Sequence, residues 1–419
     1  MAEPEYSGVT TGETAESSVA EIHPLASVEH GTSGLRGFDA VASRLVFAGL
    51  ERLRDGYLTL HLPDGSKRVF GATGASHVEM TVRRWRFFSR LVRGADVGAG
   101  ESYVDGDWST PDLVGLTRLF LANEDVLAPP RLVGLLGRLR DRVSHAARSN
   151  RRSQARRNIH AHYDLSNDFY RLFLDPSMTY SAALFDQPGT GLELAQKAKY
   201  ERLAQWAGIR AGDRVVEIGC GWGGFAEYAA GTLGCSVTGI TLSEEQAAFA
   251  RRRVREAGLS ERVEIRLLDY RDLRGSFDAV VSIEMLEAVG HRYLDSFFTT
   301  CHRVLRPGGR VALQTISIAD QIYDRYRRGS DWIRKYIFPG GHLPSLGALQ
   351  ASMARTTPFV VDRMENVATH YATTLRHWRR RFWMRIGDVR ALGFDQRFVR
   401  MWDFYLATCE AAFLERHIG

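Results

Sequence analysis

Long apolar runs are absent from this 419-residue sequence, and none approaches the roughly 20 residues that a helix needs to cross a bilayer. The first residues, MAEPEYSGVTTGETAESS, also lack the positive charge and the apolar stretch of a secretory signal peptide. With 44% hydrophobic residues the chain can nevertheless bury a large core. We therefore expect a globular, cytoplasmic protein with room for a second, smaller domain.

Cysteine is scarce, because only Cys220, Cys235, Cys301 and Cys409 occur. Their spacing matches no metal-ligand pattern, so we predict no metal site. A chain of this length does not depend on a disulfide framework for its stability. We expect the four thiols to be reduced and structural.

Positive charge is concentrated in two places, although the formal net charge is only +6. Residues 131–157 contain a single acid, Asp141, and nine arginines: Arg131, Arg138, Arg140, Arg142, Arg148, Arg151, Arg152, Arg156 and Arg157. A second cluster mixes cations with aromatic residues: Arg325, Arg327, Arg328, Arg334 and Lys335 with Tyr323, Tyr326, Trp332 and Tyr336. Such clusters bind phosphates, so nucleic acid and an anionic membrane surface are both candidate partners. The alternative is that both clusters are solvated surface segments.

The chain divides into four parts by composition and pattern. Residues 1–35 are rich in Ser, Thr, Glu and Gly without periodicity, which predicts a disordered tail. Residues 36–140 are predicted to form a small N-terminal domain, in which the segment Tyr57–Phe70 alternates apolar and polar residues around Asp-Gly and indicates a β-hairpin. Residues 141–158 are a basic linker, and residues 159–419 form the main domain.

The main domain alternates short apolar runs with helical stretches, which is typical of a parallel sheet with helices on both faces. The predicted strands are Arg214–Ile218, Ser236–Leu242, Val263–Leu268, Phe277–Ile283, Gly309–Thr315 and Phe359–Val367. The predicted helices include Phe225–Thr232 and Glu244–Ala257, the second of which opens with a capping box of Ser243 and Gln246. We predict a doubly wound, Rossmann-like α/β fold whose ligand lies beyond the carboxyl ends of the central strands, close to Ile218 and Ile283.

A glycine-rich loop, EIGCGWGG at Glu217–Gly224, follows the first of these strands. Its glycines carry no Cβ, so they allow a tight turn and a close approach of the backbone to a ligand. The dinucleotide fingerprint would also need an acid at the end of the second strand, where Gly239–Leu242 stands instead. Glu217 before the glycines and Asp269 at the end of the third strand instead suit a cationic adenosyl ligand that carries an amino acid and a sulfonium.

Further motifs follow one another along the chain: GESYVDGDW (Gly100–Trp108), HYDLSNDFY (His162–Tyr170), LDPSMTYS (Leu174–Ser181), GITLSEEQ (Gly239–Gln246), DYRDL (Asp269–Leu273), EMLEAVG (Glu284–Gly290), YIFPGGHLPS (Tyr336–Ser345) and HYATTLRHW (His370–Trp378). With the glycine loop, they resemble the cyclopropane-fatty-acid synthase family over roughly residues 95 to 419. The resemblance implies a class I methyltransferase that uses S-adenosylmethionine to modify the double bond of an unsaturated acyl chain. It also implies a lipid-binding insertion around residues 318–350.

The resemblance assigns residues to the methyl donor. The positions that match those around S-adenosylmethionine in the family are Tyr163, Tyr180, Ser181, Gly219, Gly221, Thr241, Leu242, Gln246, Asp269 and Tyr270. Glu217 joins them as the acid before the glycine loop. Gln246 would take the place of the acidic ribose anchor that the second strand lacks.

A second group matches the reacting centre, where relatives hold a bicarbonate ion that receives a proton from the methylated carbocation: Glu287, Ile316, Phe338 and Tyr371. Two positions depart from the family, because its cysteine after the Tyr-Ser pair is Ala182 and its histidine before Thr-Ile is Gln314. The Gln314 amide can still donate a hydrogen bond to bicarbonate, but neither residue titrates. The structural alternatives are core packing for Phe338 and Tyr371 and helix capping for Glu287.

The chemistry implied by the resemblance needs positioning rather than activation. An alkene has no proton to remove before it attacks a sulfonium, so the protein mainly has to orient the two reactants. The carbocation that follows is stabilised by aromatic faces and a nearby carboxylate, for which Phe338, Tyr371 and Glu287 are the candidates.

The expected partners follow from this chemistry. They are the acyl chain of an unsaturated phospholipid, an anionic membrane surface at whose inner face the protein would sit peripherally, a reductase if the product is a methyl branch, and a second copy of the chain in a homodimer. Two other classes of function remain open. A nucleic-acid or small-molecule methyltransferase would share the glycine loop, but the sequence has no acidic or Asn-Pro-Pro-type motif for a target base, so we expect no nucleic acid. A non-catalytic lipid-surface module would not bind S-adenosylmethionine.

Overall fold

The structure is a computed structural model that describes residues 37–71, 76–127 and 166–419. All of them belong to one unit of the chain, Leu35–Gly419. The predicted tail at 1–35, the predicted linker at 141–158, the nine arginines of residues 131–157 and Tyr163 lie outside the described residues.

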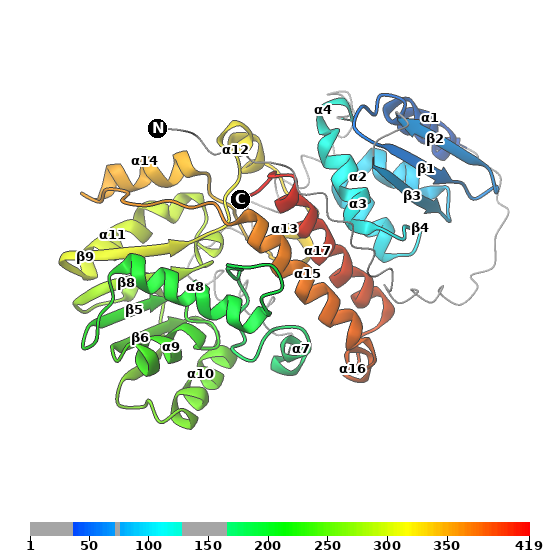
Figure 1. Cartoon of the computed structure of the whole chain (residues 1–419). Helices are drawn as coiled ribbons and strands as arrows, with labels where there is room; N and C mark the ends of the chain where they lie inside the picture. Colours follow the sequence, from blue (N-terminus) through cyan, green and yellow to red (C-terminus); the bar gives the residue numbers. More distant parts are fainter. Residues whose placement is uncertain (1–36, 72–75, 128–165) are drawn as a thin grey trace, which may run out of the picture. The chain divides into compact units, whose positions relative to one another are not determined.

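The main domain is built on a parallel sheet with the strand order β7-β6-β5-β8-β9 (Figure 1). Its strands are β5 (Arg214–Ile218), β6 (Ser236–Thr241), β7 (Val263–Leu267), β8 (Phe277–Ile283) and β9 (Leu305–Gln314). The chain order reverses between β5 and β8, which makes this the switch point of a doubly wound sheet. The predicted Rossmann-like fold is confirmed.

Helices cover both faces of this sheet. Adjacent strand residues point to opposite faces, so each face packs against its own set of helices. Val215 packs with α8 (Leu192–Ala207), α9 (Gly224–Thr232) and α10 (Glu244–Glu256). Its neighbour Val216 packs on the other face with α11 (Leu294–Val304), against which α14 (Leu346–Thr356) lies. Continuous apolar runs in the strands are therefore buried on both sides.

The predicted strand Phe359–Val367 is wrong, because residues 357–367 contain no helix or strand. The apolar side chains of this segment do not enter the core: Val360 is 87% exposed and Met364 is 65% exposed. Between them, Asp362 pairs with Arg310 at the surface. A short apolar run whose side chains enter no core does not by itself produce a strand.

The predicted capping box at the start of α10 is half formed. The Ser243 hydroxyl accepts a hydrogen bond from the Gln246 backbone N–H at 3.2 Å, as an N-cap should. The Gln246 side chain does not return to Ser243, because its Oε1 accepts a hydrogen bond from the Thr241 hydroxyl at 3.0 Å. Gln246 is thus held against the end of β6.

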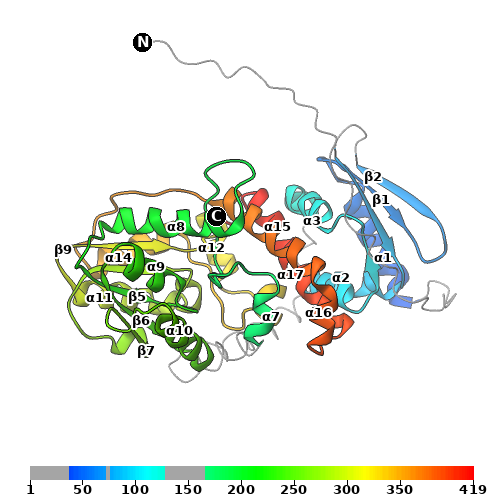
Figure 2. The same cartoon turned by 60° about the horizontal axis from the view of Figure 1, so that its bottom comes forward.

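The N-terminal domain has a small sheet with the order β2-β1-β3-β4. Its elements are α1 (Gly37–Leu50), β1 (Tyr57–His61), β2 (Lys67–Gly71), β3 (His77–Val82), α2 (Arg86–Val104), β4 (Trp108–Ser109), α3 (Leu113–Ala122) and α4 (Glu124–Leu127). Strands β1 and β2 are the predicted hairpin, which is confirmed. Helix α1 lies against the sheet (Figure 2), where the ring of Phe47 stacks on Phe70.

Three C-terminal helices connect the two sheets: α15 (Ala368–Met384), α16 (Ile386–Ala391) and α17 (Gln396–Leu414). Helices α15 and α17 run side by side in both views (Figures 1 and 2). The Tyr103 hydroxyl of α2 donates to Asp403 of α17 at 3.0 Å, and Arg400 donates to the Trp108 carbonyl at 2.8 Å. No helix within the described residues is long and apolar enough to span a bilayer.

The predicted insertion, residues 318–350, contains α12 (Asp320–Tyr326) and α13 (Trp332–Tyr336). Its cations, which form the second basic cluster, are already paired with acids of the chain. Arg325 contacts Glu124, and Lys335 contacts Glu101, both in the N-terminal domain. The remaining pairs are Arg327 and Arg328 with Asp324, and Arg334 with Asp331. The cations of this cluster are therefore paired with acids of the same chain.

Candidate active site

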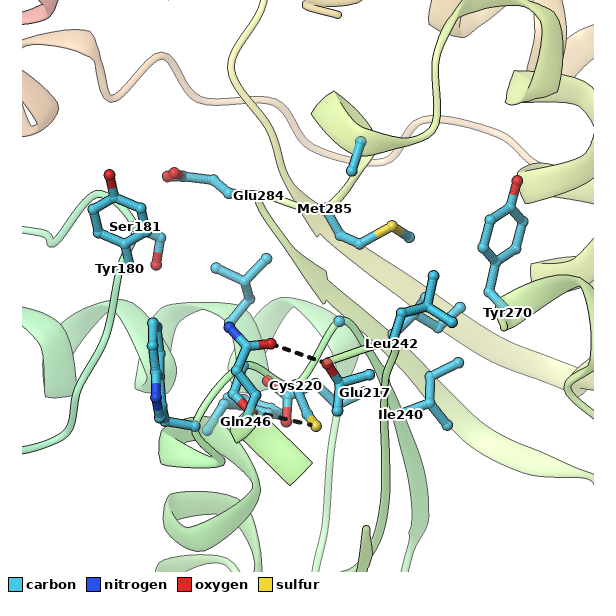
Figure 3. A pocket seen from close by; sticks show the side chains of 18 of the residues that line it. Tyr180, Ser181, Glu217, Cys220, Ile240, Leu242, Gln246, Tyr270, Glu284 and Met285 are labelled. Carbon is cyan, nitrogen blue, oxygen red and sulfur yellow. Dashed lines mark hydrogen bonds between the residues drawn. The ribbon is translucent and has the colours of Figure 1, made fainter. Parts of the chain in front are cut away.

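A cavity opens at the carboxyl ends of β5, β6 and β8, where the sequence predicts the ligand (Figure 3). The loop from β5 to α9 forms one side of it. Gly219 has φ +86°, and a Cβ there would lie 2.7 Å from the Met285 side chain, so this position requires glycine. Gly221 has φ +51°, and a Cβ there would meet nothing within 4 Å.

Ten of the predicted methyl-donor residues line this cavity, and Tyr163 lies outside the described residues. The ten are Tyr180, Ser181, Glu217, Gly219, Gly221, Thr241, Leu242, Gln246, Asp269 and Tyr270. They come from four separate parts of the chain and are brought together only by the fold. Asp269 is paired with Arg271, whose Nη2 lies 2.5 Å from the carboxylate.

The polar groups of the cavity can bind a ligand that carries a positive charge and hydrogen-bond donors. Glu217 is 3% exposed, and burial raises its pKa to about 8, against the opposing charge of Lys199. Its Oε2 is buried without a hydrogen-bond partner among the described residues. A buried oxygen of this kind is costly without a partner, and a cationic donor on a ligand would both bond to it and favour the ionised form of Glu217. The amino group of S-adenosylmethionine is such a donor, so the cavity fits this molecule.

A second group of residues meets at Glu284, which sequence reasoning missed. Glu284 follows β8 directly, lines the cavity, and has a left-handed backbone with φ +50°. Its Oε2 accepts a hydrogen bond from the Tyr371 hydroxyl at 2.6 Å. Its Oε1 accepts from the Ala182 backbone N–H and from the Gln314 amide, both at 2.8 Å. In Figure 3 the carboxylate points toward Tyr180 and Ser181.

Glu287 lies in a 3-10 turn at Leu286–Ala288 and has other hydrogen-bond partners than Glu284. Its Oε1 accepts hydrogen bonds from the Ile316 backbone N–H at 2.5 Å and from the Thr315 hydroxyl at 2.9 Å. Its Oε2 is buried without a hydrogen-bond partner among the described residues. The structure thus brings Glu287 together with Ile316, while Tyr371 and Gln314 meet at Glu284.

The two carboxyl groups differ in their ability to hold a charge. Burial raises the pKa of Glu287 to about 8, and the charge of Glu284 raises it further. Burial also raises the pKa of Glu284, but the donors Tyr371, Ala182 and Gln314 oppose that shift. Since two neighbouring buried carboxyls do not both ionise readily, the three donors to Glu284 favour the negative charge there and leave Glu287 as the neutral acid.

Phe338 packs near Tyr180 at the edge of the cavity. It follows α13, and its ring lies 6.5 Å from that of Tyr180, which lines the cavity, and 5.7 Å from that of Tyr405. Tyr180 and Tyr405 are hydrogen bonded through their hydroxyls at 2.8 Å. Aromatic faces therefore lie next to the cavity on the side of Glu284.

The sequence contains only a partial signal for Glu284. This residue is the first after a central strand, at the edge of the sheet where the ligand was predicted. No local signal distinguished it from Glu287 in EMLEAVG, because the choice depends on Tyr371, Gln314 and Ala182, which are distant in sequence.

Comparison with known proteins gives consistent matches. Residues 150–419 match the family described as mycolic acid cyclopropane synthetase. The chain is 40% identical over 386 residues to the tuberculostearic acid methyltransferase UfaA1 of Mycobacterium tuberculosis, covering 90% of each protein. It is 36% identical over 361 residues to the cyclopropane-fatty-acyl-phospholipid synthase of Escherichia coli K12, covering 84% of this chain and 89% of that one.

Solved structures agree with these matches. The cyclopropane synthase MmaA2 from Mycobacterium tuberculosis has a TM-score of 0.59 at 31% identity, covering 63% of this chain and 95% of that one. The mycolic acid cyclopropane synthase CmaA1 complexed with SAH and CTAB has a TM-score of 0.58 at 32% identity, with the same coverage.

We predict that Gly221→Leu abolishes binding of S-adenosylmethionine while the protein stays folded. The added side chain extends into the open space at the glycine loop, and the left-handed backbone costs about 1–2 kcal/mol. Isothermal titration calorimetry measures the affinity. Gly212→Leu is the matched control, because Gly212 also has a left-handed backbone with open space around it and lies outside the cavity. Normal affinity in Gly221→Leu would show that the ligand lies elsewhere.

Proposed function

Because this chain belongs to the mycolic acid cyclopropane synthetase family, and is therefore an S-adenosylmethionine-dependent methyltransferase of lipid acyl chains, we propose that it acts on the cis double bond of an unsaturated phospholipid acyl chain. One observation supports this reaction above all. A buried carboxylate, Glu284, lies at the edge of the methyl-donor cavity and accepts three hydrogen bonds from three separate elements.

The residues around the cavity have a positioning role in this reaction. S-adenosylmethionine supplies an electrophilic methyl group when bound. The glycine loop, Gln246, Tyr180 and Ser181 would hold the donor, since all of them line the cavity. No residue needs to activate the alkene, so the rate depends on holding its double bond in line with the methyl group.

The carbocation left on the acyl chain needs a dry, electron-rich surface. Tyr180 and Phe338 offer aromatic faces beside the cavity, and the carboxylate of Glu284 offers a negative charge. Both interactions strengthen as positive charge develops, so they stabilise the transition state more than the bound alkene.

We assign Glu284 as the base that ends the reaction. The new methyl group loses one proton to Glu284, and the electron pair of the broken C–H bond quenches the cation. If the pair attacks the cationic carbon directly, a cyclopropane forms. If a hydride first moves from the methylated carbon to its neighbour, the same proton loss gives an exocyclic methylene.

The sequence led us to expect bicarbonate at this site, but the donors present there do not fit this ion. The Ala182 N–H, the Gln314 amide and the Tyr371 hydroxyl all donate to Glu284, so they are not available to a separate anion. The side chain thus takes the role that bicarbonate has in relatives, and we propose that turnover needs no added bicarbonate.

We favour the methylene product, which a separate reductase would convert to a methyl branch. The support is the similarity to the tuberculostearic acid methyltransferase UfaA1, which extends over 90% of this chain. The replacement of two family residues by Ala182 and Gln314 at the proton-accepting side agrees with a changed final step.

We predict that a host expressing this protein gains one CH2 unit on its unsaturated phospholipid acyl chains. Mass spectrometry of membrane lipids measures the gain, and double-bond-specific fragmentation separates a methylene from a cyclopropane. The Gly221→Leu variant is the control that cannot bind the donor. No gain on any unsaturated lipid would refute the proposed function, and a cyclopropane would refute the product assignment alone.

We also predict that Glu284→Gln lowers turnover by roughly 10²–10⁴-fold with unchanged donor affinity, since Gln can still accept hydrogen bonds but cannot take up a proton. Glu287→Gln is the matched substitution three residues away, and we expect a smaller loss because Glu287 is already protonated. Turnover on phospholipid vesicles and calorimetry with the donor separate the two effects, with and without bicarbonate. A larger loss in Glu287→Gln would transfer the role of base to Glu287.

Membrane attachment is a further part of the proposal. The second basic cluster is engaged in internal ion pairs, so we propose that the arginines of residues 131–157 bind anionic lipid. Each contributes about 1 kcal/mol near such a surface, and salt weakens the attraction. We predict that neutralising Arg151, Arg152, Arg156 and Arg157 reduces co-sedimentation with anionic vesicles. Equal binding of the unaltered protein to neutral and anionic vesicles would contradict this role.

A further inference from the structure

Lys199 is a fully buried, titratable side chain for which the reaction described above has no use. Its side chain projects from α8 and has 0% exposure, which is rare for lysine unless the charge is paired. Its Nζ donates a hydrogen bond to the Ser181 hydroxyl at 2.7 Å. Ser181 lines the methyl-donor cavity. Lys197, two residues earlier on the same helix, is exposed.

The segment that Lys199 holds is the junction between the two halves of the site. Ser181 lines the methyl-donor cavity, and the next residue, Ala182, donates its backbone N–H to Glu284. Five polar groups of Ser181–Ala183 are each bonded to a side chain from another part of the fold. The partners are Gln196, Lys199, Glu284, Gln314 and Thr374. A shift of this segment would therefore move donor and base relative to each other.

Charge connects the same groups. Burial lowers the pKa of Lys199 to about 7, and the carboxyl groups of Glu284, Asp175 and Glu217, in that order, oppose this shift when they are ionised. Asp175 and Glu217 are themselves buried, and Lys199 in turn lowers the pKa of Glu217 and of Glu284. The titratable groups that interact with Glu284 are thus Tyr371 of α15, through a hydrogen bond, and Lys199 of α8 and Glu287 of the turn after β8, through their charge.

The sign of this coupling is fixed by physics. An ammonium near a carboxylate stabilises its ionised form, and burial strengthens the effect because water does not screen it. Without Lys199, the carboxyls of this cluster would hold their protons to higher pH. Glu284 would then be protonated in the pH range in which it has to act as a base.

We propose that Lys199 is a positioning residue that fixes Ser181 at the methyl-donor cavity and supplies the positive charge that keeps Glu284 ionised until it accepts the proton. This inference rests on the role proposed for Glu284. It assigns two separable tasks to one side chain, a hydrogen bond to Ser181 and a charge beside Glu284.

Two variants separate these tasks. Lys199→Gln keeps a hydrogen-bond donor but loses the charge, and Lys199→Met loses both at similar length. Lys197→Met, at the exposed position of the same helix, is the matched control. For each protein we would measure turnover against pH, donor affinity by calorimetry, and the infrared band of protonated carboxyl groups, with Glu284→Gln in the same background to identify the Glu284 signal.

We expect the rise of turnover with pH to move to higher pH by about 1–3 units in both Lys199 variants, because the base titrates later without the cation. Activity would thus fall near neutral pH and recover in alkali, and a protonated Glu284 band would appear at pH 7. Donor affinity should fall in Lys199→Met more than in Lys199→Gln. The Lys197→Met control should match the unaltered protein in every measurement.

Other outcomes overturn the inference. An equal loss of turnover at all pH values would reduce Lys199 to a structural residue, as would an unchanged Glu284 band in both variants. The infrared band requires no turnover, so it tests Lys199 even if the protein proves inactive on every lipid. In that case the proposed function fails while the charge coupling is still decided.

Discussion

The burial of one carboxylate, Glu284, constrains much of this structure. A buried charge is tolerated only where donors surround it, and these donors come from the end of β9, from α15 and from the segment before α8. Three parts of the chain, 182, 314 and 371, must therefore meet at one point beyond β8. The left-handed backbone of Glu284 is the local cost of pointing its side chain there.

A base that is part of the chain differs physically from a bound anion. A bound anion has to be captured from solution and can leave, whereas a side chain is always present at a fixed place. Its protonation must then be controlled by its neighbours, because it cannot be exchanged for a fresh ion. Burial favours the neutral acid, and the donors together with Lys199 favour the carboxylate. Lys199, on the buried side of α8, is the residue that provides the positive charge.

The sequence predicted the parts of this structure that depend on local pattern. Strands β5 to β9, the hairpin at Tyr57–Phe70 and the glycine loop each have a periodicity or a turn signal of their own. The error at Phe359–Val367 arose because the apolar run there has no core to enter. Glu284 and Lys199 were missed because no local pattern points to their contacts. Glu284 bonds to Ala182, 102 positions away in the sequence, and Lys199 bonds to Ser181, 18 positions away.

The N-terminal domain reaches the same site through the insertion. The Trp332 backbone N–H donates to Asp96 of α2 at 3.0 Å, and the Trp332 ring packs so closely on Gly100 that a Cβ there would lie 2.4 Å from it. Helix α13 is thereby fixed against α2, and the Phe338 N–H at its end is bonded to the Ile333 carbonyl at 2.9 Å. Phe338 in turn carries the aromatic face beside the cavity. The place of that face is thus set by packing between distant parts of the chain, as the place of the base is set by Glu284 and its donors.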